Sequence, residues 1–190
     1  RGLAPLGNAS IELIVTFEKI DAVTDELLAT VTEVLPKAVS LELNQGGVVG
    51  ALTGEGLAVI GSLTKLRRLH FWGNSWQFKN KDLAFLEKLR ELEVLDLRLY
   101  KVTAGIGGTL VKLSKLRNLD LTSIKMTDGA CKKLAKLPLE TLAINDGKLT
   151  DKAMVALASI PTLKKLGWTY IAGDCGAAGL EALANHRYLE

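Results

Sequence analysis

The feature that most constrains this chain is a unit of about 24 residues that recurs along its length. Its clearest copy spans residues 116–137 and begins with an L-x-x-L-x-L run over 116–121. The alternation of apolar and polar residues in that run predicts a short, half-buried strand. Thr127 and Asp128 then offer side-chain oxygens that cap a helix, and an apolar stripe over 130–137 predicts a short amphipathic helix. A unit this small cannot bury its own apolar face, so it requires stacked copies on both sides.

The chain supplies those copies, because the strand pattern returns at intervals of 23 to 28 residues. Its apolar triplets are Ala38/Leu41/Leu43, Leu66/Leu69/Phe71, Leu92/Leu95/Leu97, Leu116/Leu119/Leu121, Leu139/Leu142/Ile144 and Leu163/Leu166/Trp168. Residues 38–188 hold six repeats, and residues 1–37 hold a degenerate first copy. Residues 189–190 either open a further copy or are the remnant of a cloning tag. We therefore predict a single repeat domain over residues 1–190.

These units resemble the leucine-rich repeat family, in the subclass whose repeats each contain a helix and read L-x-L-x-x-T-x-x-T-D-x-x-L. Bacterial, ribonuclease-inhibitor-like and F-box-associated arrays share that pattern. The resemblance is specific over 38–188 and weak over 1–37. It implies an α/β solenoid, or horseshoe, with a parallel sheet on the concave face and helices on the convex face. It also implies a binding role and no catalytic chemistry. The asparagine that the family places after the strand is matched by Asn74 and replaced by Tyr100, Ile124, Gly147 and Ile171 in other copies.

No constellation of residues in the sequence points to catalysis. His70 and His186 are the only histidines, and they fall in different repeats. No Cys or His pair has metal-ligand spacing, and the glycine-rich stretches 45–56 and 104–108 lack the Lys-Ser/Thr ending of a phosphate-binding loop. We predict that the protein is not an enzyme and has no catalytic residue, no metal site and no cofactor.

The charges of the chain are unevenly spread. The formal net charge is +3, but residues 61–137 carry sixteen basic and seven acidic side chains. Such a cluster can mark a binding surface, although a solvated helix face gives the same pattern. Acidic residues alternate with the basic ones, whereas a domain that tracks phosphates is more strongly basic. The sequence therefore argues against a nucleic-acid partner, and no apolar run is long enough to span a membrane.

Cys131 and Cys175 lie two repeats apart, which corresponds to roughly 10 Å along stacked strands. A disulfide requires Cα atoms within about 7 Å, so we predict two free thiols. Cys131 takes the helix core position that Met154 and Leu180 take in later repeats. Free thiols favour the cytoplasm or another reducing compartment. The glycosylation sequon at Asn8 is compatible with secretion, so both locations stay open.

The residues between the strand leucines point away from the core, because side chains alternate along a strand. Stacking the copies aligns these residues in columns. The middle column reads Glu42, His70, Asp96, Asp120, Ala143 and Gly167, and the next column includes Trp72, Arg98, Thr122 and Asn145. Trp, Tyr and Arg are enriched at interface hot spots. We predict a binding patch formed by Arg68, His70, Trp72, Asp96, Arg98, Tyr100 and Asp120.

Trp72 has two possible roles. It is either an outward anchor for a partner or a cover over the segment 73–80, which contains Trp76 and Phe78. Trp168 differs, because it takes an inward leucine position and is predicted to be core.

The arginines of the patch also have two possible roles. The planar fork of an arginine suits a partner with an acidic or aromatic anchor. Alternatively, Asp96 and Asp120 neutralise the arginines within the protein.

The predicted function is binding of another protein or a peptide through the sheet face and the adjoining loops. One alternative is the substrate-recognition array of a larger enzyme complex of the ubiquitin-ligase type. Another is recognition of a glycan or other microbial surface molecule, which favours an exported protein. We expect a monomer or one part of a larger chain.

Overall fold

The computed structural model describes residues 14–16, 23–44, 52–72, 77–145, 149–169 and 175–189. Seven strands in these ranges form one parallel sheet, and their spatial order equals their order in the chain. The strands are β1 (Ile14–Thr16), β2 (Ser40–Asn44), β3 (Arg68–Trp72), β4 (Val94–Arg98), β5 (Asn118–Lys125), β6 (Thr141–Asn145) and β7 (Lys165–Thr169).

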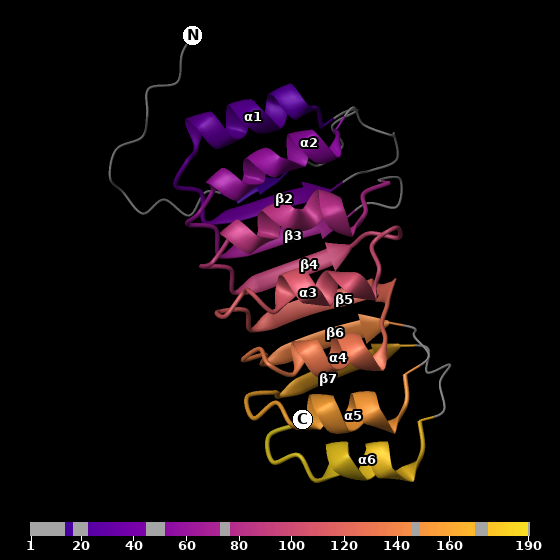
Figure 1. Ribbon diagram of the computed structural model, residues 1–190. Helices are drawn as coiled ribbons and strands as arrows, with labels where there is room; N and C mark the ends of the chain where they lie inside the picture. The colour runs from indigo at the N-terminus through magenta and orange to yellow at the C-terminus, as the bar shows by residue number, and fades with distance from the viewer. Residues whose placement is uncertain are drawn as a thin grey trace.

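A helical segment follows each strand, and we number the repeats one to seven by their strands. The segments are α1 (Asp25–Val34), α2 (Gly54–Leu57) with the 3-10 helix η1 (Ala58–Ser62), η2 (Asn80–Lys88), η3 (Ala104–Ile106) with α3 (Gly107–Leu110), α4 (Asp128–Leu134), α5 (Asp151–Ala158) and α6 (Ala177–Ala184). Figure 1 shows the helices in one layer along the sheet, from indigo α1 to yellow α6. This is the predicted solenoid, with the sheet on the concave side and the helices on the convex side. The side of the sheet that faces away from the helices is called the sheet face below.

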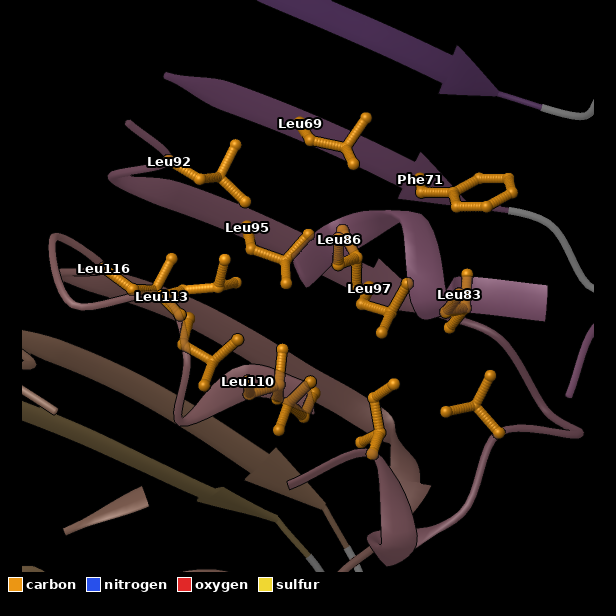
Figure 2. Packing of buried hydrophobic residues seen from close by; sticks show 14 of the residues in the cluster. Leu69, Phe71, Leu83, Leu86, Leu92, Leu95, Leu97, Leu110, Leu113 and Leu116 are labelled. Carbon is orange, nitrogen blue, oxygen red and sulfur yellow. The ribbon is translucent and has the colours of Figure 1, made fainter. Parts of the chain in front are cut away.

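The inward apolar residues of the strands stack in columns that form the core. Leu69, Leu95 and Leu119 are partners in adjacent strands, as are Phe71 and Leu97. All five side chains are buried. Figure 2 shows the leucines of the strands turned toward the leucines of the helical segments. Burying a leucine contributes about 1.5–3 kcal/mol, so these columns supply most of the stabilisation between repeats.

The helical segment of repeat three is tighter than the α-helix that the sequence predicted. Its buried residues are Leu83, Phe85 and Leu86, and the buried Leu89 follows at its C-cap. A 3-10 helix has three residues per turn, so Leu83 and Leu86 lie on the same side of η2. In α4 the buried Cys131 and Leu134 have the same three-residue spacing, so the spacing of the buried residues does not explain why η2 is tighter.

Strand β5 departs from the predicted alignment because it contains a bulge. Its pairing with β6 runs regularly to Leu121 and resumes only at Lys125, which faces Asn145. Thr122 therefore does not face Asn145, and that part of the predicted column is wrong. The extra residues include Ile124, whose side chain is fully buried. The bulge thus re-aims the chain so that one more apolar residue enters the core.

Threonines cap several of the helices, as predicted for Thr127. The Thr127 hydroxyl accepts a hydrogen bond from the backbone N–H of Ala130 at 3.3 Å. Equivalent caps are made by Thr24, Thr53 and Thr150. Each satisfies a backbone donor that the first helical turn leaves open.

The starts of neighbouring helices are also linked to one another. The Asp128 carboxylate accepts hydrogen bonds from the Thr150 backbone N–H at 2.9 Å and from the Thr150 hydroxyl at 2.7 Å. Equivalent links join Asp25 to Thr53, Asn80 to Thr103 and Asp151 to Gly176. The Asp25 carboxylate approaches α2 so closely that a Cβ added at Gly56 would collide with it. The repeated Thr-Asp pair of the sequence therefore serves two repeats, capping one helix and holding the next.

The core of repeat seven is only partly covered. Trp168 is partly buried and packs against the core, in line with its inward position. Leu180 is 58% exposed, so its predicted core role is wrong. The reason is its place on α6, the last described helix, whose far side no described helix covers. None of the described helices is long and apolar enough to cross a membrane.

Candidate functional site on the sheet face

The strand register brings most of the predicted patch together. His70, Asp96 and Asp120 are partners across β3, β4 and β5. Trp72 and Arg98 are partners across β3 and β4. Because adjacent strands lie about 4.8 Å apart, these side chains are direct neighbours on the sheet face. We refer to His70, Trp72, Asp96, Arg98 and Asp120 as the β3–β5 cluster.

Arg98 is held by both carboxylates of the β3–β5 cluster. Its Nε donates to Asp96 Oδ1 at 2.9 Å and its Nη2 donates to Asp96 Oδ2 at 3.1 Å. The same Nη2 donates to Asp120 Oδ2 at 2.8 Å. This is the internal neutralisation that the sequence left open. The fork of Arg98 is therefore already occupied and does not offer a bidentate site to an acidic partner.

Asp96 is unusually buried for a charged residue, with 7% of its surface exposed. Burial raises the pKa of its carboxyl, and the nearby Asp120 carboxylate raises that pKa further. The Arg98 guanidinium opposes both effects. His70 adds a weaker contact, since its Nδ1 lies 3.9 Å from Asp96 Oδ2. The pKa of Asp96 is raised overall, chiefly because burial disfavours its charged form.

Trp72 is positioned by its neighbours yet remains accessible. The Arg98 guanidinium carbon lies 5.0 Å from the centroid of the Trp72 ring, which is cation–π geometry. The His70 ring meets it edge-on, with centroids 6.2 Å apart. Even so, 36% of Trp72 is exposed.

The proposed covering role of Trp72 concerns the segment 73–80. Residues 73–76, including Trp76, lie outside the described residues. Phe78 is described, and it is buried with its ring centroid 5.7 Å from that of Phe71. Phe78, the one described aromatic residue of that segment, therefore packs in the core against Phe71, the inward-facing neighbour of Trp72.

Two predicted members of the patch stand apart from the β3–β5 cluster. Arg68 lies at the first position of β3, opposite Val94, and is half-buried. Tyr100 lies in the turn after β4 and is 64% exposed. Tyr100 makes no hydrogen bond or ring contact with another residue in the part of the chain that the structure describes.

The area beside the β3–β5 cluster has a feature that the predicted patch does not include. On β6 and β7, the partners that continue the row of Asp120 are Ala143 and Gly167. A Cβ added at Gly167 would be in ordinary contact with that of Ala143, at 3.5 Å. The sheet face therefore steps down from the large side chains of β3 and β4 to a low area on β6 and β7. The two small residues in the middle column of the sequence were the signal for this step. We call Ala143 and Gly167 the floor.

The bulge of β5 lies at the same place. Regular pairing of β4 with β5 ends at Asp96 and Asp120, so Arg98 has no strand partner on β5. The backbone N–H of Thr122 instead donates to Asp120 Oδ1 at 2.9 Å. No signal in the sequence marked this bulge. Within the described ranges, no three His, Cys, Asp or Glu side chains are grouped so as to hold a metal ion.

Comparisons with known proteins support the fold and not a particular activity. The chain matches no known protein family by sequence, and it matches no curated protein. Its structure is similar to that of an internalin, InlF, from Listeria monocytogenes, with a TM-score of 0.59 and 18% sequence identity. The similarity covers 93% of this chain and 52% of the internalin, so the chain spans about half the length of that protein. InlF is a leucine-rich repeat protein, and the present chain has the leucine-rich repeat fold.

Proposed function

We propose that the protein is a binding scaffold, without catalytic chemistry of its own, that takes another protein or a peptide on its sheet face. The centre of the binding surface is Trp72 with the ion-paired Arg98 beside it. The similarity to an internalin supports a binding scaffold of the leucine-rich repeat type in general. The location on the sheet face rests on the β3–β5 cluster alone.

The observation that carries this proposal is the way in which Trp72 is held. Its ring is in contact with Arg98, and Arg98 is itself fixed by Asp96 and Asp120. An aromatic ring that is partly exposed and already ordered loses little conformational entropy on binding. Such rigid aromatic and arginine side chains are typical of hot spots at protein interfaces.

The test is selection of peptides from a random library displayed on phage, using the immobilised protein as bait. Affinities of the selected peptides are then measured for the wild type and for Trp72→Ala. We expect Trp72→Ala to weaken binding by about 2 kcal/mol or more, because an exposed anchor ring is lost. The melting temperature should be nearly unchanged, since Trp72 is not a core residue.

The matched control is Lys132→Ala, which removes an exposed side chain from α4 on the opposite side of the molecule. Binding should not depend on Lys132. If the selected peptides bind Trp72→Ala as well as the wild type, while the melting temperature falls, Trp72 has a structural role. The binding surface must then lie elsewhere.

A further inference from the structure

We infer that the partner of the sheet face contributes a positively charged side chain, Lys or Arg, which lies over the floor and pairs with Asp120. This inference rests on the proposed function and specifies the chemistry of the partner. It reverses the expectation of an acidic anchor that the sequence suggested for the arginines.

The charges of the β3–β5 cluster favour a cation. Asp96 and Asp120 supply two carboxylates, and Arg98 is the single guanidinium between them. These two carboxylates and one guanidinium together carry one net negative charge. An additional cation would balance that charge, whereas an acidic partner would have to approach two carboxylates. The pKa of Asp96 is raised first by burial, and the Asp120 carboxylate beside it adds to that effect.

Asp120 is the carboxylate that a partner can reach. Its side chain is 24% exposed, compared with 10% for Asp96. Arg98 occupies one bonding direction at Oδ2 and the Thr122 N–H occupies one at Oδ1. A carboxylate has about four acceptor positions, so Asp120 retains capacity for a further donor.

The shape beside Asp120 suits a long side chain. The floor residues Ala143 and Gly167 follow Asp120 in the same row and project little from the sheet. Gly167 lies two strand spacings, roughly 10 Å, from Asp120 along this row. The stem of a Lys or Arg can lie against such a surface while its charged end reaches the carboxylate.

The lysines of the protein itself do not fill this place. Lys125 and Lys165 are on β5 and β7 and are exposed. Neither forms an ion pair within the described part of the chain, where Asp120 pairs with Arg98. Among the described residues Arg98 is the one cation that pairs with Asp120, and the proposed partner supplies the second.

The experiment compares short oligolysine and oligoglutamate peptides of equal length, with binding measured by fluorescence anisotropy at low and at physiological salt. We expect oligolysine to bind and oligoglutamate not to bind. Asp120→Asn should weaken oligolysine binding about fivefold, because one charge-assisted contact becomes a neutral one. The single amide oxygen of Asn replaces two carboxylate oxygens that now accept from Arg98 and from the Thr122 N–H, so one of these contacts is lost. Asp120 is not a core residue, so the fold should persist, and circular dichroism checks this.

The matched control for lost charge is Glu26→Gln, which removes an exposed carboxylate from α1 on the helix side. A second variant, Ala143→Lys, places a cation on the floor within the protein and should abolish oligolysine binding. Its control is Ala84→Lys, at an exposed position of η2. Neither control should change the affinity by more than the measurement error.

Three results would overturn the inference. These are failure of oligolysine to bind, preference for oligoglutamate, or an equal loss of affinity in Asp120→Asn and Glu26→Gln.

The displayed peptides separate this inference from the proposed function. If they depend on Trp72 but contain no excess of Lys and Arg, the binding surface stands and the cationic partner is wrong. If none depends on Trp72, the proposed function itself is wrong.

Discussion

Repeats five and six are joined at their helix starts by a polar link that repeats four and five lack. Asp128 opens α4 and holds the N–H and hydroxyl of Thr150 in the next repeat. Ala104 opens η3 at the equivalent position, and its methyl group offers nothing to Thr127. The apolar column of Leu95, Leu119 and Leu142 runs through both boundaries. The difference shows that this solenoid has a common apolar core and a second, intermittent set of polar connections.

The boundary between repeats four and five also has a short regular strand pairing of three residue pairs, as many as between β1 and β2. β4 and β5 pair only as far as Asp96 and Asp120, beyond which β5 bulges. The ion pair of Arg98 with Asp120 crosses this same boundary at 2.8 Å. The proposed binding surface therefore includes the junction between repeats four and five, where a partner contacting Trp72 and Asp120 would hold both repeats.

The largest effect should come from the core that both boundaries share. Leu119→Ala and Leu142→Ala each empty a buried leucine position in adjacent strands. Each should lower the free energy of unfolding by about 2–5 kcal/mol, through lost burial and a cavity. Chemical denaturation measures both. A loss much smaller for one of them would show that the core is not continuous across the boundary.

The next effect should come from removing the link itself. Asp128→Ala takes two hydrogen bonds from Thr150 and should lower the free energy of unfolding by about 1–3 kcal/mol. Asp128→Asn is the matched control, because Asn80 contacts the same two groups of Thr103, accepting from its backbone N–H and donating to its hydroxyl. The Asn variant should retain most of the stability. If the Ala variant is as stable as the wild type in denaturant titrations, the link contributes nothing.

Removing a helix cap should lower the free energy of unfolding less where the capping threonine is not also bonded to the preceding repeat. Thr127→Ala removes the cap of α4 and should cost about 0.5–2 kcal/mol. Thr150→Ala removes a cap and also the hydroxyl that Asp128 holds, so it should cost more. Equal losses in thermal unfolding of the two variants would contradict the comparison. A loss for Thr127→Ala larger than for Leu119→Ala would show that the assignment of repeat five is wrong.

The comparison can also be tested by adding a link. Ala104→Asp places a carboxylate where Asp25, Asp128 and Asp151 stand in other repeats. It should raise the free energy of unfolding by about 0.5–1.5 kcal/mol through new bonds to Thr127. In a Thr127→Ala background the gain should shrink, because the hydroxyl partner is missing. If the gain is equally large in that background, the new carboxylate stabilises the protein through its charge at the start of the helix and not through a bond to the Thr127 hydroxyl.

The smallest expected effect concerns a rate. Both thiols are free; Cys131 is buried in α4, and burial followed by the Asp128 charge raises its pKa to about 12. At pH 8 only about one part in ten thousand of that thiol is ionised, and the thiolate is the reactive form. Mass spectrometry should therefore show iodoacetamide modifying the half-exposed Cys175 before Cys131. Faster labelling of Cys131 would indicate frequent opening of the boundary between repeats four and five.

The sequence predicted the architecture well because the residues of each repeat encode the strand and the helix of that repeat. The triplets placed the inward residues of the strands, and their spacing alone aligned His70 with Asp96 and Trp72 with Arg98. The Thr-Asp pairs marked the helix starts. The predictions failed where a local pattern depends on its neighbours, as with Leu180, whose exposure is set by what lies beside α6.

Periodicity by itself determined which residues of this protein share a face, since side-chain direction follows from the strand and helix repeat alone. Only the tertiary structure decided what those residues do there. It directed Arg98 to Asp96 and Asp120, extended β5 by a bulge, and carried the Asp128 carboxylate across to Thr150. The physical reason is that these choices depend on distances between repeats. A carboxylate bonds to whichever donor packing brings within about 3 Å, and no spacing along one chain segment contains that distance.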